Sequence, residues 1–179
     1  MQEENRQEVE EQAPEVEIDQ ARFQQLLNEI EGNQNLQLGI LGGVIAALIG
    51  AAAWAVVTVV TGYQIGWMAI GVGFLVGYAV RISGKGIHRI YGVVGSVLSL
   101  LGCLAGNLSS VCAIISKQEG IPFLYILTRL NPQIIIDLMT ATFGAIDLLF
   151  YGIAVYEGYR FSFRRITEEE LAGLVRTKS

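Results

Sequence analysis

Charge is the scarcest property of this chain away from its two ends. Charged residues make up 16% of the 179 positions, whereas ordinary soluble domains carry about 25%. No charged residue stands between Glu31 and Arg81, or between Arg89 and Lys117. Uncharged apolar stretches of this length are typical of transmembrane helices, so a soluble globular domain is excluded as the expected class.

Residues that carry catalysis or bind metals are also few. The two cysteines, Cys103 and Cys112, lie nine positions apart in one apolar stretch, and this spacing puts them on opposite sides of a helix. The single histidine, His88, stands among basic residues, while a metal site needs several converging ligands. The sequence has no nucleophile paired with a base, no zinc signature and no cofactor fingerprint. We therefore expect a protein that is not an enzyme, with no metal and no cofactor.

The net charge of −5 comes from the amino-terminal arm, because ten of the 17 acidic residues lie in the first 31 positions. Residues 1–20 are acidic and rich in glutamine, a composition that predicts a disordered arm. Residues 21–38 are interpreted as an amphipathic helix and a hinge, lying at the membrane interface or, alternatively, binding a partner. The apolar face of this helix consists of Phe23, Leu26, Leu27 and Ile30.

Four apolar stretches are candidates for membrane spans. They are residues 39–60, 64–80, 90–115 and 134–156, whose helical lengths run from about 25 to about 39 Å around a hydrocarbon thickness of roughly 30 Å. Residues 117–132 are interrupted by two prolines and are expected to form an interfacial or re-entrant element on the external side. The predicted fold is an all-α membrane protein with four transmembrane helices in two tight antiparallel hairpins.

The carboxyl-terminal tail, residues 157–179, is predicted to contain one short helix. Thr167 and Glu170 match a capping box, which marks a helix that begins at residue 168.

The basic residues predict the orientation. Ten of the 12 lie in the amino-terminal arm, in the loop between the second and third spans, and in the tail, which by the positive-inside rule puts both termini in the cytoplasm. We expect six of them to form a rim that contacts anionic lipid headgroups and not nucleic acid. These six are Arg81, Lys85, Arg89, Arg160, Arg164 and Arg165.

Glycine is frequent inside the spans, and in lipid small residues let helices approach closely. In an antiparallel hairpin of the first two spans, Gly50 is expected to face Gly73, Ala46 to face Gly77, and Ala53 to face Ala69. The glycines predicted to pack helices together are Gly43, Gly50, Gly66, Gly73, Gly77, Gly102, Gly106 and Gly144.

Polar residues of the third and fourth spans are expected to meet in one seam. Its predicted members are Asp147, Ser99, Asn107, Thr140 and Tyr78. A charged carboxylate near the middle of a span costs at least ~2.5 kcal/mol, so we interpret Asp147 as a neutral carboxyl that is hydrogen-bonded to Ser99 or Tyr78. The alternative is that Asp147 belongs to a proton or ion pathway.

The run TGYQIGWMAIGVGFLVGYAVRISGKG resembles a widespread group of uncharacterised bacterial multi-span proteins. In that group a glycine-rich G-Y-x-I-G-W/L-x-A-x-G-x-G-x-x-V-G-x-x-V-R hairpin follows an alanine-rich first helix. The resemblance covers about residues 45–86 and implies a bacterial inner-membrane protein. It implies no activity and assigns no functional residue.

Two functions fit the sequence. The first is a non-catalytic membrane protein, an accessory subunit or scaffold that binds protein partners through its cytoplasmic segments. The second is a small oligomeric transporter or channel that uses Asp147, Asn107 and Ser99 as a polar path. The first is favoured because four short spans leave little room for a cavity within one subunit. The expected partners are the lipid bilayer and either another protein or a second copy of the chain.

Overall fold

The computed structural model describes residues 16–63 and 65–177, which belong to two compact units. One unit, the bundle, is formed by residues 33–164. The other, the terminal module, combines segments from both ends of the chain, residues 16–32 and 165–177. Most of the arm predicted to be disordered, residues 1–15, lies outside the described residues.

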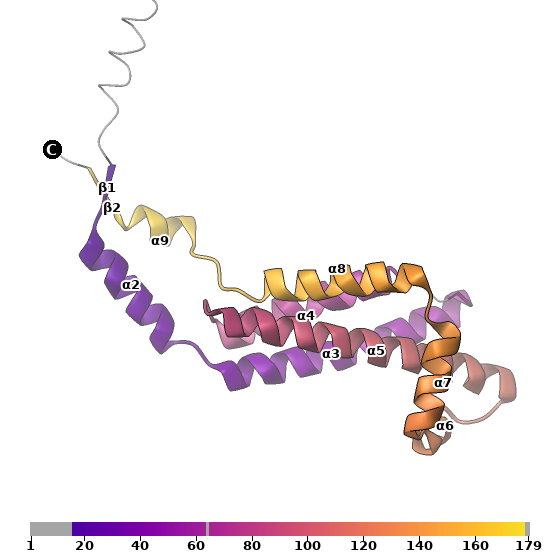
Figure 1. Cartoon of the computed structure of the whole chain (residues 1–179). Coiled ribbons are helices and arrows are strands. Elements are labelled where there is room, and N and C mark those ends of the chain that lie inside the picture. The colour runs from indigo at the N-terminus through magenta and orange to yellow at the C-terminus, as the bar shows by residue number, and fades with distance from the viewer. Residues whose placement is uncertain (1–15, 64, 178–179) are drawn as a thin grey trace, which may run out of the picture. The chain divides into compact units, whose positions relative to one another are not determined.

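Four helices of the bundle pack side by side (Figure 1). They are α3 (Leu36–Thr61), α4 (Met68–Gly84), α5 (Arg89–Glu119) and α8 (Ala145–Phe161). Helix α3 packs against α4 and α5, and α8 packs against the same two helices. Both pairs predicted to form hairpins, α3 with α4 and α5 with α8, are in contact, and each of these helices also has extensive contacts outside its predicted hairpin.

Two of these helices, α3 and α5, are long and apolar enough to cross a membrane. Helix α4 is apolar but has 17 residues. Helices α7 (Pro132–Thr142) and α8 form a pair bent by 106°, which is a third candidate if the pair counts as one broken span. The structure is thus helical with two or three candidate spans by length and composition.

The predicted continuous span over residues 134–156 is wrong, because the chain leaves the helix at Phe143 and Gly144. Gly144 has an extended backbone, with φ −108° and ψ 167°. Its N–H donates to the Asp147 carboxylate at 2.8 Å, so the aspartate closes the first turn of a new helix. Helix α7 and the short α6 (Phe123–Arg129) lie across the end of the bundle in Figure 1.

Apart from Trp54, Tyr91 and Tyr151, mostly small side chains fill the interior of the bundle, and large apolar side chains cover its outside. Ala69, Val76 and Ala154 are fully buried, whereas Leu48 and Leu148 are 63% and 67% exposed. Such a distribution is the reverse of a soluble helix bundle, whose large apolar side chains lie in the core. It fits a surface solvated by lipid chains.

The terminal module contains a two-stranded antiparallel ladder, in which β1 (Val16–Ile18) pairs with β2 (Val175–Thr177). Strand β1 lies within residues 1–20, so the prediction of disorder is wrong for these three residues. Helix α2 (Gln20–Gly32) follows β1, and helix α9 (Glu168–Ala172) precedes β2. The capping box predicted from the sequence begins α9, because Thr167 and Glu170 each bond the other's backbone N–H.

Candidate functional site

Gly73 and Gly77 of α4 pack against α8 and not against α3. A Cβ added at Gly73 would lie 2.5 Å from the Ala154 carbonyl oxygen, and one added at Gly77 would lie 3.1 Å from the carbonyl of Glu157. The predicted pairing of Gly50 with Gly73 is therefore wrong, since a Cβ at Gly50 would meet a Val72 methyl group at 3.1 Å. Helix α8 reaches this proximity because α4 presents almost bare backbone to it.

Helix α8 is also in close contact with α5. A Cβ at Gly95 would lie 2.3 Å from the Gly158 carbonyl oxygen, and one at Gly158 would lie 2.7 Å from the Gly95 carbonyl oxygen. Ala154 and Gly158 of α8 and its C-cap residue Ser162 recur every fourth residue, and all three are buried. This stripe of small residues lets α8 fit between α4 and α5.

The remaining predicted glycines fall into several environments. Added Cβ atoms at Gly102 and Gly106 would approach Ala47 and Trp54 of α3. At Gly43 the nearest atoms would belong to Leu98 and Val80, at Gly66 to Phe150, and at Gly144 to the Asp147 carboxylate alone.

Helix α5 supplies the polar interior of the bundle. Ser99, Cys103, Asn107 and Ser110 are all buried on one side of the helix. The Cys103 thiol donates to the Ala69 carbonyl of α4 at 3.7 Å. Ser110 accepts a hydrogen bond from the Thr58 hydroxyl of α3 at 3.2 Å.

Contacts with α8 complete this polar interior. The Tyr151 hydroxyl donates to the Cys103 carbonyl oxygen at 3.3 Å and has the Asn107 side chain as a second partner. Ser96 of α5 donates to the Val155 carbonyl oxygen at 3.1 Å. Helix α5 therefore bonds to α3, α4 and α8, with interhelical bonds of a kind that averages ~0.6 kcal/mol.

Only part of the predicted polar seam is assembled in this way. Ser99 and Asn107 are in the interior, but Thr140 is exposed on α7 and bonds to its own helix at Ile136. Tyr78 is 45% exposed and stacks on Phe74 of the same helix, with ring centroids 5.9 Å apart. The expected bond between Asp147 and either Ser99 or Tyr78 is wrong, because Asp147 caps the first turn of α8.

Two buried polar atoms near this seam are Ser99 Oγ and Trp54 Nε1. Neither has a hydrogen-bond partner among the residues that the structure describes. Sequence reasoning missed Trp54, Thr58, Ser96 and Ser110 as members of the polar interior. The spacing of Ser96, Ser99, Cys103, Asn107 and Ser110 at three or four residues was the available signal, because it continues one helical stripe.

The capping role of Asp147 predicts a graded response to substitution. Asp147→Ala removes both the bond to the Gly144 N–H and the carboxylate charge at the helix N-terminus, and is expected to lower the free energy of unfolding by about 1 kcal/mol. Asp147→Asn keeps an acceptor oxygen and should cost less. Denaturant unfolding in detergent measures both. Asp137→Ala is the control, since Asp137 is exposed and its carboxylate accepts a hydrogen bond from the Gln133 side chain on the same helix at 2.9 Å. An equal cost at positions 137 and 147 would contradict the capping role.

The end of the bundle opposite to Asp147 carries four residues of the predicted basic rim. Arg81, Lys85, Arg89 and Arg160 lie where α4 and α8 end and α5 begins. The loop that joins α4 to α5 is held from two sides, because the Asn35 N–H donates to the Gly84 carbonyl and the Arg164 N–H donates to the Gly86 carbonyl, each at 2.9 Å. The chain therefore enters and leaves the bundle at this one end. Arg165, the sixth residue of the predicted rim, is the first residue of the terminal module's second segment.

Metal binding has no geometric support in residues 16–63 and 65–177, where no three His, Cys, Asp or Glu side chains come together as metal ligands. No match to the chain was found among family models, curated proteins or solved structures.

Proposed function

We propose that the chain is a non-catalytic polytopic protein of the bacterial inner membrane that acts as an accessory subunit or scaffold. In this proposal the terminal module lies in the cytoplasm and binds a protein partner. The observation that carries the proposal is the pairing of β1 with β2, because it joins the segments that precede and follow the bundle into one small folded unit.

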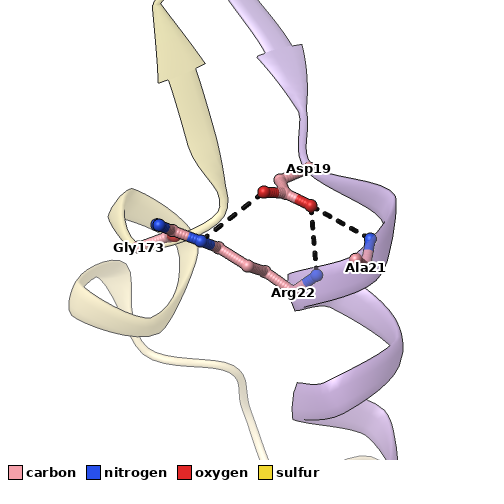
Figure 2. Close-up of polar contacts among 4 residues, drawn as sticks. All are labelled: Asp19, Ala21, Arg22 and Gly173. Atoms are coloured by element: carbon pink, nitrogen blue, oxygen red, sulfur yellow. Dashed lines mark hydrogen bonds and ion pairs between the residues drawn. The ribbon is translucent and has the colours of Figure 1, made fainter.

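Side-chain contacts at the end of the ladder support a defined module (Figure 2). The Asp19 carboxylate accepts hydrogen bonds from the N–H groups of Ala21 and Arg22, at 3.0 and 3.2 Å. Arg22 pairs with Asp19 at 3.5 Å and donates to the Gly173 carbonyl at 3.1 Å. A ladder of two short strands is marginal alone, so these bonds add to its stability.

The charge of the module favours a protein partner over the lipid surface. Helix α9 begins with three glutamates, Glu168, Glu169 and Glu170, and α2 ends near Glu29 and Glu31. Residues 16–32 and 165–177 together carry seven acidic and three basic residues. The anionic cytoplasmic leaflet attracts basic segments, so this net negative charge disfavours binding of the module to the lipid surface. A partner with a basic surface is electrostatically complementary.

The proposed topology has four crossings. The Asn35 N–H donates to the Gly84 carbonyl, so α4 ends at the end of the bundle where α3 begins. The Arg164 N–H donates to the Gly86 carbonyl, so α8 also ends there. Helix α4 is about 25 Å long, slightly shorter than the roughly 30 Å hydrocarbon core. The exposed Tyr63 and Trp67 suit an aromatic belt beside this short helix.

Transport is the weaker candidate because of where Asp147 lies. It is at the beginning of α8, where its carboxylate closes a helix turn. A path through the bundle would have to follow the buried side of α5, which is occupied by Tyr151 and Asn107 in mutual contact.

Partner recovery from native membranes tests the proposal. The full chain, affinity-tagged and cross-linked in cells, is expected to retain at least one protein that is reduced severalfold in the double variant Asp19→Ala/Arg22→Ala. Hydrogen exchange at β1 and β2 verifies that this variant opens the ladder. Gln25→Ala, at an exposed position of α2, is the control. A partner profile that is unchanged when the ladder is open would refute the proposed role of the module.

A further inference from the structure

An apolar groove of about 480 Å³ lies on the outside of the bundle between α3 and α5. Its floor is made of small residues from the two helices, which are Ala51, Ala52, Ala55, Ala105, Ser109 and Ala113. Helix α6 adds Phe123 and Leu127 as part of a wall. The volume is within the range of pockets that hold small ligands, about 300–1,000 Å³.

The shape of the groove selects an extended chain as its occupant. From Leu48 to Val60, the lining residues of α3 cover about 18 Å at 1.5 Å per residue. Twelve residues of α3, α5 and α6 line the groove, and all of them except Ser109 are apolar. A chain of methylene groups, about 4 Å across at carbon contact distance, fits without rearrangement.

One end of the groove carries a positive charge. The Lys117 ammonium donates to the carbonyl oxygen of Val59, a groove-lining residue, at 3.0 Å. An ammonium has three N–H donors, so two remain for another ligand. Tyr63 and Trp67, 75% and 71% exposed, lie just beyond α3 and mark the depth at which lipid headgroups are found.

We propose that this groove binds one acyl chain of an anionic phospholipid from the surrounding bilayer, with the lipid phosphate held by Lys117. The apolar lining solvates the chain, and the ammonium at its end selects a negative headgroup. This site does not involve the terminal module or the proposed protein partner, so a test of lipid binding here is separate from a test of partner binding.

Native mass spectrometry of the full chain in detergent tests the site with phosphatidylglycerol and phosphatidylcholine of equal chain length. The wild-type protein is expected to retain one phosphatidylglycerol molecule that Ala52→Phe loses. The occupancy of this lipid site should be at least fivefold lower in the variant than in the wild type. Ala52 is exposed and lines the groove, so the added ring fills it without entering the core. Ala53→Phe is the matched control, because Ala53 is exposed on the same helix and does not line the groove.

Lys117 variants separate charge from packing. Lys117→Gln keeps a donor for the Val59 carbonyl but loses the charge, and should reduce phosphatidylglycerol occupancy about fivefold and remove the preference over phosphatidylcholine. Lys117→Arg should retain both the phosphatidylglycerol occupancy and the preference over phosphatidylcholine. Equal lipid occupancy in Ala52→Phe and Ala53→Phe, or an unchanged preference in Lys117→Gln, would overturn the proposal. A wild-type dimer that Ala52→Phe dissociates would overturn it too, since the groove would then be an interface between copies.

Discussion

Gly73→Leu is expected to lower the free energy of unfolding of the detergent-solubilised protein by about 1–3 kcal/mol, the range for overpacked interiors. The new Cβ would lie 2.5 Å from the carbonyl oxygen and 2.7 Å from the Cα of Ala154. These are backbone atoms, which cannot rotate away as a side chain can. Helices α4 and α8 would have to separate, and the loss is measured by denaturant or thermal unfolding.

The matched control stands two residues away on the same helix. Gly71 is exposed, and a Cβ added there meets nothing within 4 Å, so Gly71→Leu should be tolerated and its higher helix propensity favours it. Gly50→Leu is expected to be intermediate, because its close neighbour is a Val72 methyl group, which can shift. If Gly71→Leu cost as much as Gly73→Leu, the contact between α4 and α8 would not be what limits substitution.

The long apolar helices could be predicted from the sequence because their signal is local. The absence of charge from residues 32–80 and from 90–116 predicted α3, α4 and α5, and the pair Thr167 and Glu170 predicted the beginning of α9. Each of these signals operates within one turn or one span. These signals can therefore be recognised without knowing which segments are neighbours in the fold.

The break before α8 was missed because hydropathy and helix continuity are different properties. Residues 134–156 are apolar almost throughout, yet the Gly144 N–H needs an acceptor once the helix ends, and Asp147 provides it. Glycine has no side chain, so only half of a capping box is formed here, the bond from the Gly144 N–H to the carboxylate three residues later. The expectation of a membrane span led instead to the interpretation of Asp147 as a buried carboxyl.

Which helices meet could not be read from the sequence. The small residues Gly73 and Gly77 define one face of α4, but the same face could pack on α3 or on α8, and a hairpin register was assumed. The ladder between β1 and β2 joins residues separated by most of the chain, with no local pattern in either three-residue strand. Both results depend on tertiary contacts.

Labelling in intact cells tests the proposed topology, and its expected effect is all or none. Single cysteines at Lys85, Gln118 and Glu169, all exposed positions, are introduced after replacement of the buried Cys103 and Cys112. The excess of basic residues at one end of the bundle predicts that this end faces the cytoplasm. A membrane-impermeant maleimide should therefore label position 118 directly, and positions 85 and 169 only after permeabilisation.

Positions 85 and 169 report on the crossings made by different helices. Position 85 tests whether α4 returns across the membrane, because Gly84 is bonded to Asn35 at the start of α3. Position 169 tests whether α8 returns as well, because it lies in the terminal module between α8 and the strand that pairs with β1. Labelling of 169 with protection of 85 would mean that the tail remains outside, which is incompatible with a cytoplasmic β1–β2 ladder. Labelling of 85 and 169 with protection of 118 would keep four crossings but invert them, so the basic end would face outward against the positive-inside rule.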